Sequence, residues 1–429
     1  SEDRRSITFY LHEGITFHDG APLTARDVEY TYKTILHPHY TGVRYGDFRV
    51  LVGAEAYKNG ESDEVPGIEV IDDYTIRFNT EKPHAPLLTS FGYGIMPAHL
   101  LADIPVGELE TADFNSHPIG SGPFVFQEFK TDQHVILTAN ENYFRGRPNI
   151  DTLVFQKIAT DAVPIWIQQG RVDFVEIAPE QYPEVDAIDF VDLYVYEALS
   201  YNYIAFNLRQ ERMADVRVRQ AMTYGFDRDT YVEVIREGFA IKANAPMPQA
   251  SWAFTDEGIN SYDYNPELAR KMLAEAGWKP GRDGILQKDG MRLELELLVP
   301  EGSRANEQMA LLFQQNMADL GIKINLVFME FNAAVDRVDA REFDMFTMGW
   351  SLSVDPDPYG IWHSSSVWND PGFFNERSDE LIEMGREETD PEKRKEIYAE
   401  WQRVINYELP DIFLSYGVVI GAIHERVQG

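Results

Sequence analysis

Cysteine is absent from the chain of 429 residues. Its absence excludes disulfide bonds, zinc sites built on cysteine and a thiol nucleophile. Basic residues are also scarce, since 38 Lys and Arg stand against 71 Asp and Glu and leave a formal net charge of −33. No basic cluster interrupts this acidity, so we expect no binding to nucleic acid or to anionic lipid surfaces. The charge is typical of a solvated acidic surface, and the alternative is attraction of cationic ligands.

Long apolar runs are missing as well, because no stretch reaches the roughly 20 residues of a membrane-spanning helix. The chain starts at Ser1 with neither an initiator methionine nor a signal peptide, which indicates a processed or truncated product. The hydrophobic fraction of 44% and the charged fraction of 25% are typical of a folded protein. The length corresponds to roughly three domains.

Motifs for catalysis and for metals are incomplete. No phosphate-binding glycine loop and no His-Glu-x-x-His motif occurs. Residues 119–122 lack the first glycine of a nucleophile elbow. Residues 355–360 imitate the start of a calcium loop, but Ser366 stands where a bidentate glutamate is required, and His37 and His39 have no third ligand nearby. We therefore expect no catalytic residue, no metal site and no cofactor.

The most informative stretch, residues 343–363, begins as an apolar strand and ends in a polar loop. Pro356 and Pro358 stiffen this loop and remove two backbone donors. A buried strand that opens into such a loop is how an α/β domain presents a ligand site, and an acidic surface turn is the alternative. The loop carries hydroxyl and carboxylate groups at Ser351, Ser353, Asp355 and Asp357.

The pattern of helices and strands is clearest after residue 226. Strand patterns at 292–299 and 322–329 flank a helical pattern at 305–320. This arrangement predicts a βαβ unit with parallel strands. We expect the strand at 343–350 to join the same sheet, so that its C-terminal end lies where such sheets bind ligands.

Elsewhere, Thr24 and Asp27 have the form of a capping box for a helix through about residue 36. Alternation on both sides of Asp72 and Asp73 predicts a hairpin of residues 68–70 and 74–78. The further predicted strands are 124–129, 135–138, 153–158, 172–177, 201–207 and 412–420, and the further helices are 215–224, 266–276, 378–387 and 391–407.

Aromatic residues, at 13% of the chain, supply a second signal. Core packing accounts for most of them. The functional interpretation is a set of flat walls that sandwich a ligand, while backbone groups and carboxylates fix its orientation. The candidates near predicted strand ends and loops are Tyr201, Tyr203, Trp350, Tyr359, Trp362 and Trp368.

Six short segments, in order along nearly the whole chain, carry a family resemblance. They are Phe-His-Asp-Gly-Ala-Pro-Leu-Thr-Ala-Arg-Asp-Val at 17–28, Gly-Ser-Gly-Pro-Phe at 120–124, Asn-Tyr-Phe at 142–144, Asp-Val-Arg-Val-Arg-Gln-Ala at 215–221, the helix at 269–278, and Gly-Trp at 349–350 with Asp-Pro-Asp-Pro at 355–358. Together they resemble the peptide- and nickel-binding solute receptors of ABC transporters, extracellular solute-binding protein family 5, with the oligopeptide receptors as the most similar group.

The resemblance implies an α/β fold with two lobes, the clamshell of type II periplasmic binding proteins in its large three-domain subclass. Residues 1–118 would form the accessory domain and the start of the first lobe. Residues 119–225 with 406–429 would form the first lobe, and residues 226–405 the second. The chain begins well inside the family's usual first domain, so we expect it to lack the family's N-terminal segment.

The resemblance also implies a receptor rather than an enzyme. It would bind an extended oligopeptide between the lobes and deliver it to a membrane permease, as a monomer in the periplasm or as a cell-surface lipoprotein. Many family members pair the ligand's amino group with an Asp where this chain has Ser353, so either Asp355 or Asp357 would substitute or the ligand's terminus would lie elsewhere. The implied ligand-binding residues are Gly349, Trp350, Ser351, Ser353, Asp355, Asp357, Tyr201, Asn202 and Tyr203.

Two alternatives stay open. The same receptor fold could bind an oligosaccharide or a metal chelate, with the aromatic walls stacking on its faces. A glycoside hydrolase using Asp355 and Asp357 is the other, although two carboxylates two residues apart on a stiff loop do not face each other across a sugar ring.

Overall fold

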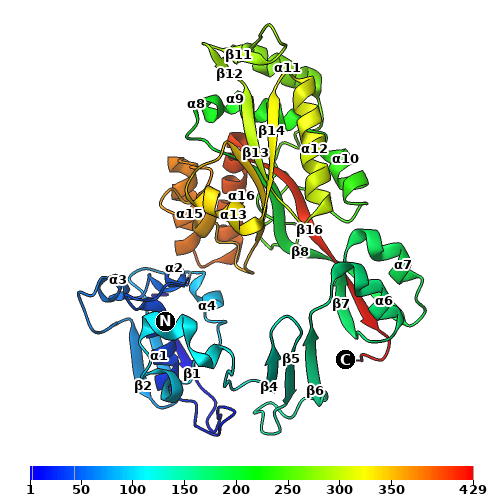
Figure 1. Ribbon diagram of the computed structural model, residues 1–429. Helices are drawn as coiled ribbons and strands as arrows, with labels where there is room; N and C mark the ends of the chain where they lie inside the picture. Colours follow the sequence, from blue (N-terminus) through cyan, green and yellow to red (C-terminus); the bar gives the residue numbers. More distant parts are fainter. Residues whose placement is uncertain (2, 43, 429) are drawn as a thin grey trace. The chain divides into compact units, whose positions relative to one another are not determined.

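The computed structural model describes every residue except 2, 43 and 429. The described residues form two compact units, and Figure 1 shows their elements coloured along the chain. Unit 1 comprises Ser1–Ala159 and Arg386–Thr389, and unit 2 comprises Thr160–Gly385 and Asp390–Gly429. Each unit buries its own hydrophobic clusters.

Unit 1 contains an antiparallel sheet of order β1-β3-β2 that packs against helix α1 (Ala25–Leu36). The predicted capping box is confirmed, because Thr24 and Asp27 hydrogen-bond each other's groups at the start of α1. The buried ring of Tyr32 on α1 lies edge-on to Phe78 of β3, with 5.1 Å between ring centroids. The predicted hairpin is likewise confirmed, because β2 (Ile68–Asp72) pairs antiparallel with β3 (Thr75–Asn79). Strand β1 (Ser6–Tyr10) pairs with β3 as well.

A second antiparallel sheet in unit 1 has the order β4-β5-β6. None of its described residues is fully buried, and Phe129, Val154 and Phe155 are exposed. The strands are β4 (Phe124–Lys130), β5 (His134–Ala139) and β6 (Thr152–Gln156). The short helices of unit 1 are α2 (Tyr45–Phe48), α3 (Ala54–Lys58), α4 (Leu87–Ser90), α5 (Ala98–Leu101), η1 (Val106–Thr111) and η2 (Asp113–Asn115).

Unit 2 is built on a mixed sheet of order β14-β13-β15-β8-β16-β7, with β9 on the side of β16. Strands β13 and β14 are parallel and joined through helix α12, so the predicted βαβ unit is confirmed. Strand β15 joins the same sheet, as expected. The strands are β7 (Phe174–Ile177), β8 (Val191–Phe206), β9 (Ile241–Lys242), β13 (Glu294–Pro300), β14 (Lys323–Met329), β15 (Met345–Ser351) and β16 (Asp411–His424).

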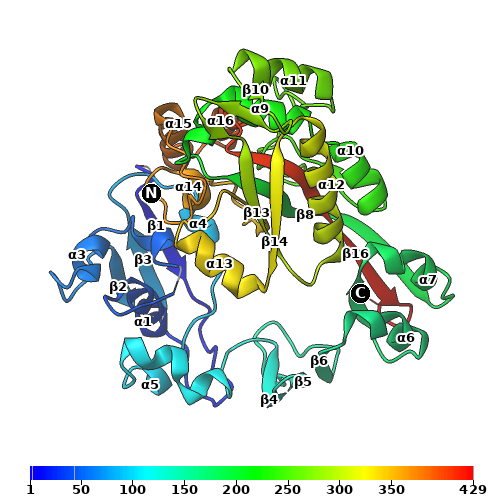
Figure 2. The same cartoon turned by 45° about the horizontal axis from the view of Figure 1, so that its top comes forward.

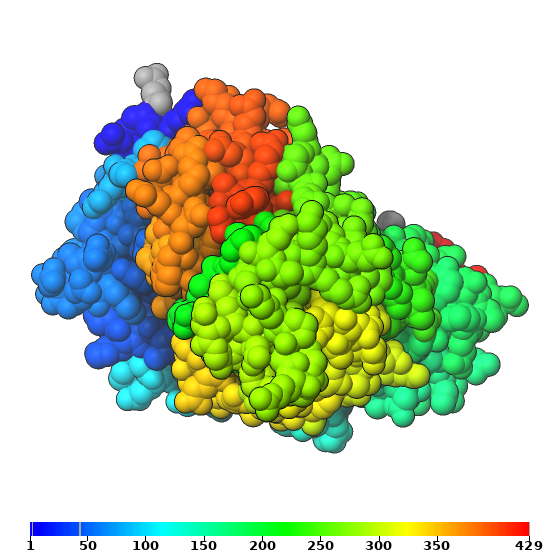
Figure 3. Space-filling model, turned by 90° about the horizontal axis from the view of Figure 1, so that it is seen from above, coloured from blue at the N-terminus to red at the C-terminus, as the bar shows by residue number. Residues whose placement is uncertain are grey.

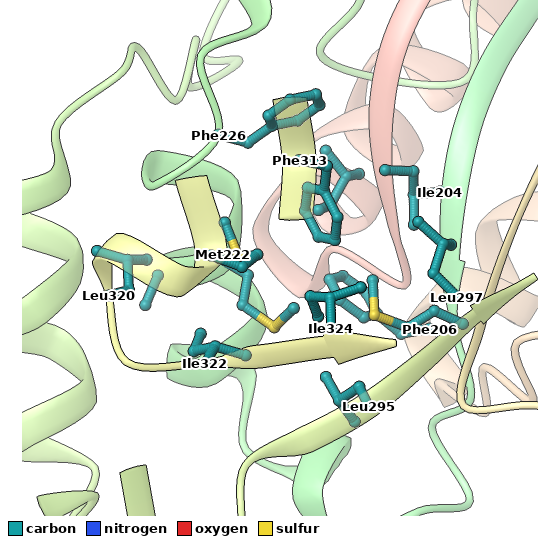
Figure 4. Packing of buried hydrophobic residues seen from close by; sticks show 14 of the residues in the cluster. Ile204, Phe206, Met222, Phe226, Leu295, Leu297, Phe313, Leu320, Ile322 and Ile324 are labelled. Carbon is teal, nitrogen blue, oxygen red and sulfur yellow. The ribbon is translucent and has the colours of Figure 1, made fainter. Parts of the chain in front are cut away.

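Successive side chains of a strand point to opposite faces of the sheet. Both faces of the central strands are covered, because apolar side chains on each face are buried. One face contributes to cluster A, which includes Ile204, Phe206, Leu295, Leu297 and Phe313, and Figure 4 shows these side chains in contact. The other face contributes to cluster B, which includes Tyr201, Tyr203, Phe346, Trp362 and Trp401. Double coverage explains why the sequence of β15 begins as a continuous apolar run rather than an alternating one.

Helices α9, α11 and α12 pack on the cluster A face, while α13, α15 and α16 cover the cluster B face (Figures 1 and 2). On the surface of unit 2, α16 lies beside the loop that precedes α11, where Arg403 donates a hydrogen bond to the carbonyl of Glu257 at 2.9 Å (Figure 3). These helices are α9 (Val216–Tyr224), α11 (Pro266–Glu275), α12 (Arg304–Asp319), α13 (Phe331–Asp339), α15 (Glu376–Glu387) and α16 (Pro391–Glu408).

The remaining elements of unit 2 are short. A small antiparallel sheet has the order β10-β11-β12 and precedes β13 in the chain. Its strands are β10 (Lys279–Pro280), β11 (Leu286–Lys288) and β12 (Met291–Arg292). The short helices are η3 (Thr160–Ala162), α6 (Val163–Gln168), η4 (Pro179–Gln181), α7 (Tyr182–Asp186), α8 (Glu211–Ala214), α10 (Arg228–Thr230), η5 (Tyr231–Ile235) and α14 (Tyr359–Trp362).

The division of the chain into an accessory domain and two lobes stays a prediction. The sheet of unit 2 takes strands from both ranges assigned to different lobes, since β8 pairs with β15. Strand β8 is also much longer than predicted, because it begins at Val191 rather than at Tyr201. Its first half has exposed or half-buried side chains on both faces, so the sequence there shows no alternation.

Candidate ligand-binding site

The candidate site is the C-terminal half of β15, where one edge of the strand is open. Along its whole length β15 pairs with β8, with Gly349 opposite Asn202 and Ser351 opposite Ser200. On its other side β15 pairs with β13 only at Met345 and Phe346. Beyond Phe346, no strand in the described part of the chain pairs with that edge.

The ladder with β8 decides which peptide groups face the open edge. Leu352 donates its N–H to the carbonyl of Leu199 at 2.7 Å, and the carbonyl of Asp344 accepts from Asn207 at 2.9 Å. In an antiparallel pair the groups of alternate residues point to opposite sides of the strand. The N–H and C=O groups of the even-numbered residues of β15, Trp350 included, therefore face β8. The N–H and C=O groups of Gly349 and Ser351 face the open edge, and both residues are exposed.

Glycine is required at position 349 by its neighbours. A Cβ atom there would lie 2.8 Å from Oδ1 of Asn202 and 3.3 Å from the carbonyl oxygen of Tyr201. The side chain of Asn202 is half-buried and donates to Oγ of Ser415 at 3.4 Å. The absence of a side chain at Gly349 thus lets the amide of Asn202 lie against the strand and leaves the edge accessible.

Exposed apolar groups border this edge. The rings of Trp350 and Trp368 lie 5.9 Å apart and are tilted by 42°. Trp368 is partly exposed, and Val354 and Val367 are among the most exposed hydrophobic residues, at 70% and 77%. The loop with Trp368 is held by a half-buried ion pair between Arg341 and Asp370. This surface can contact apolar parts of a ligand.

Tyr201 and Tyr203 have their side chains in cluster B rather than on the surface. Their exposed fractions are 0% and 3%. Burial raises the pKa of both phenols well above the ordinary value. Trp362 is equally buried, at 1%. Among the described residues these rings pack the core, and a contact of Tyr201, Asn202 or Tyr203 with a ligand stays a prediction.

The loop after β15 contains a buried ion pair that the sequence analysis missed. Arg394 of α16 donates to both carboxylate oxygens of Asp355, and both distances are 2.9 Å. Asp355 is 8% exposed and Arg394 is 5% exposed. Burial disfavours the guanidinium charge, but the hydrogen bonds and charge interactions with Asp355 and Tyr398 together outweigh burial and raise the pKa of Arg394. Asp355 is thus engaged by its own chain, which leaves it poorly placed to pair with a ligand's amino group.

Sequence periodicity could have indicated Arg394. It lies on the same stripe of α16 as the buried Tyr398, Trp401 and Ile405, at helical spacing. A charged residue on the buried face of an amphipathic helix needs a partner of opposite charge. Only the fold shows that this partner is Asp355, because the two are far apart in the sequence.

The other predicted loop residues mostly stabilise the loop itself. Ser353 donates its hydroxyl to the carbonyl of Asp355 at 2.7 Å. Asp357 donates its N–H to Oδ1 of Asp355, and its own carboxylate accepts from the N–H of Tyr359, each at 3.1 Å. A pocket of about 40 Å³ lies beside the loop, lined also by Trp362 and Trp401. Its volume suits a water molecule rather than a side chain.

Three further observations concern the described chain beyond this loop. Among the described residues, no group of three or more His, Asp or Glu side chains could hold a metal ion. No helix in the same part of the chain is long and apolar enough to cross a membrane. A larger cavity of about 660 Å³ lies in unit 1 beside α1, and none of the predicted site residues lines it.

Comparisons with known proteins agree with the sequence motifs. The family model described as bacterial extracellular solute-binding proteins, family 5 Middle, matches residues 1–371. The oligopeptide-binding protein AppA of Bacillus subtilis is 33% identical over 428 residues, which are 98% of this chain and 77% of that protein. The heme-binding protein A of Haemophilus influenzae is 31% identical over 458 residues, covering 100% of this chain and 79% of that protein. The solved structure of the Bacillus subtilis protein with a nonapeptide has a TM-score of 0.86 at 31% identity and covers 100% of this chain and 84% of that one.

Proposed function

Because the chain belongs to the bacterial extracellular solute-binding proteins of family 5, we propose that it is a receptor that binds an oligopeptide and delivers it to the permease of an ABC transporter. It would act outside the cytoplasm, in the periplasm or as a lipoprotein at the cell surface. We propose a monomer that has neither enzymatic activity nor affinity for nucleic acid. The similarity to an oligopeptide-binding protein and to its complex with a nonapeptide supports a peptide as ligand.

The observation that carries the proposal is the open edge of β15. An extended peptide has N–H and C=O groups at the spacing of a strand, so it can add to a free edge by main-chain hydrogen bonds. The peptide groups of Gly349 and Ser351 face that edge and are exposed. A sugar has no such repeat of donors and acceptors. The edge therefore favours a peptide over an oligosaccharide.

Main-chain binding also supports broad specificity. Hydrogen bonds to the peptide backbone do not depend on the ligand's sequence. The groups that border the edge, such as Trp368, Val354 and Val367, offer exposed apolar surface. Water can fill the space around ligand side chains of different size. We therefore propose that the receptor accepts many peptides of similar length.

The glycoside hydrolase alternative is less well supported by the geometry. A glycosidase needs one carboxyl group to donate a proton and another to act on the opposite face of the sugar. Both oxygens of Asp355 bind Arg394, and Asp355 is nearly inaccessible. Asp357 is bound to the same loop. These carboxylates hold the loop together, which is the role that we propose for them.

The test is to identify what the purified protein retains. We would incubate it with randomised peptide mixtures of two to about nine residues, separate bound from free peptide by gel filtration, and identify the retained peptides by mass spectrometry. Parallel samples would receive haem, a nickel–histidine complex and an oligosaccharide mixture. Calorimetry would then measure the affinity of each retained compound. We expect retention of peptides with dissociation constants in the micromolar range or below, which corresponds to a binding free energy of about −8 kcal/mol or more negative. Retention of haem, the nickel complex or a sugar without any peptide would refute the proposed ligand class.

A further inference from the structure

We propose that Arg394 is a positioning residue for the ligand site, because it sets the shape of the loop that continues β15. The inference rests on the proposed function, since it assigns a role in peptide binding to a residue that is too buried to touch a peptide. Three sets of contacts support it: those that hold Arg394, the ion pair of Arg394 with Asp355, and those of Asp355 within the loop.

Arg394 is itself held from several directions. Its Nε donates to the carbonyl of Gly385 on α15 at 2.8 Å, and its Nη2 donates to the hydroxyl of Tyr398 at 3.2 Å. The guanidinium carbon lies 5.3 Å from the ring centre of Trp252 and 5.4 Å from that of Tyr398. Arg394 therefore has little freedom to change its orientation, and it offers Asp355 a fixed fork of two donors.

The ion pair passes this fixed orientation to the loop. Both oxygens of Asp355 bind Arg394, and one of them also accepts from the N–H of Asp357. The carboxylate of Asp357 in turn accepts from the N–H of Tyr359, where α14 begins. The chain of contacts thus runs from α16 through Asp355 to the end of the loop.

Packing and local hydrogen bonds also support the loop, in which Asp355, Pro356 and Pro358 are buried. Pro356 and Pro358 cannot donate backbone hydrogen bonds. At its start, Leu352 is tied to β8, and at its end Trp362 donates to the carbonyl of Pro358 at 2.9 Å. Between these points, the side chains of Ser353, Asp355 and Asp357 all form hydrogen bonds within the loop. Asp355 in addition binds Arg394 of α16 through both of its carboxylate oxygens.

A buried ion pair adds little net stability, because removing two charges from water costs about as much as their attraction returns. Its bidentate geometry, however, specifies where the two groups lie. The loop begins directly after Ser351, whose peptide groups we assign to ligand binding. A shift of the loop would move the end of the binding edge and the exposed Val354 with it.

The decisive variant is Arg394→Lys, which keeps the charge but loses the fork. Hydrogen–deuterium exchange of the full chain without peptide would follow the backbone amides of Asp357 and Tyr359. We expect their exchange to become at least about tenfold faster, because the opening of these hydrogen bonds becomes easier. Equilibrium dialysis against a randomised nonapeptide mixture should show an affinity about tenfold weaker, since the edge and the loop no longer keep their relative position. Asp355→Asn should have the same effect, and the double variant should be no worse than either single one.

The matched control is Arg219→Lys. Arg219 is another buried arginine, at 4% exposure, and it binds the carbonyls of Glu408 and Leu409 at the opposite end of α16. Arg219→Lys should lower the melting temperature at least as much as Arg394→Lys does. It should leave hydrogen exchange in the loop and peptide affinity unchanged. Unchanged loop exchange in Arg394→Lys would overturn the inference, and so would faster exchange with wild-type affinity, or an equal loss of affinity in Arg219→Lys. If the wild-type protein retains no peptide at all, the proposed function fails, while the exchange measurement still decides whether Arg394 holds the loop.

Discussion

At the scale of single residues, the site depends on what is missing as much as on what is present. Gly349 has no side chain, so that the amide of Asn202 can lie against β15. Asp355 looks like a candidate ligand group in the sequence, yet Arg394 binds both of its oxygens. Asp411, at the start of β16, is 1% exposed and its Oδ1 has no hydrogen-bond partner. These three positions give two tests.

Gly349→Ala should weaken both the fold and the site. The new Cβ atom would lie 2.8 Å from Oδ1 of Asn202, so that the amide must move toward its neighbours. We expect the free energy of unfolding to fall by about 1–2 kcal/mol, the usual cost of a modest steric overlap. Urea denaturation and peptide calorimetry would measure the two effects. Gly360→Ala is the control, because its Cβ would meet no atom within 4 Å, so it should lower neither the stability nor the peptide affinity.

Asp411 should make stability depend on pH. Burial, and to a lesser extent the nearby charge of Asp370, raise its pKa well above the ordinary value of 3.8. The folded chain therefore keeps a proton that the unfolded chain loses, so this group lowers the stability as the pH rises from 3.8 through the folded-state pKa. Asp411→Asn removes the titration, and we expect a gain on the order of 1–3 kcal/mol at neutral pH that vanishes in acid.

The measurement for Asp411 is a series of urea denaturations of both proteins between about pH 3 and pH 8, a range that spans the ordinary pKa of a carboxyl group. The difference in unfolding free energy should grow as the pH rises. A constant difference across this range would show that the pKa of Asp411 is the same in the folded and in the unfolded chain, which would contradict the prediction.

At the scale of elements, the central feature is a strand with one paired edge and one open edge. β15 obtains its position from β8 on one side and from two residues of β13 on the other. Helices on both faces bury its first half, whereas its second half extends to the surface. The sheet thus holds the open edge in place while Gly349 and Ser351 remain exposed, which is what the proposed binding by strand addition requires.

Proline substitutions can separate the two edges. Ser351→Pro removes an N–H group that faces the open edge, and a proline is tolerated where a strand has no partner. We expect peptide affinity to fall about fivefold to tenfold, the value of one hydrogen bond, with little change in stability. Leu352→Pro should instead lower the stability, because the N–H of Leu352 donates to the carbonyl of Leu199 at 2.7 Å. The same loss of stability in both variants would contradict the assignment of the edges.

At the scale of the whole molecule, charge is the dominant feature. The formal net charge of −33 implies repulsion between acidic groups over much of the surface. Most of the ion pairs in the described part of the chain involve exposed side chains, for example Arg147 with Glu141 and Arg377 with Glu400. Exposed pairs contribute little stability, so they do not offset the repulsion.

Salt should therefore stabilise the protein. Raising the ionic strength from about 0.01 M to 0.5 M shortens the distance over which charges interact from about 30 Å to below 10 Å. We expect the melting temperature in sodium chloride to increase over this range, since repulsion is screened more than the short contacts. Calorimetry or circular dichroism would measure it. A decrease would mean that the ion pairs outweigh the net charge.

The sequence alone determined the elements whose signals are local. The capping box at Thr24, the parallel strands around α12 and the strand that ends at Trp350 were each predicted from spacing and are present in the fold. Hydrophobic period and capping are properties of neighbouring residues, so they can be recognised without any knowledge of distant contacts. The six family motifs are likewise short local segments. All of them lie within residues 1–371, which the family model matches.

Tertiary structure decided what each of these elements does. The burial of Tyr201, the open edge at Gly349 and the pairing of Asp355 with Arg394 all depend on segments that are distant in the chain. The order of strands in the sheet differs from their order in the sequence, so no local pattern shows which edge stays free. Whether a carboxylate binds a ligand or its own chain is likewise decided only when the fold brings a guanidinium to it.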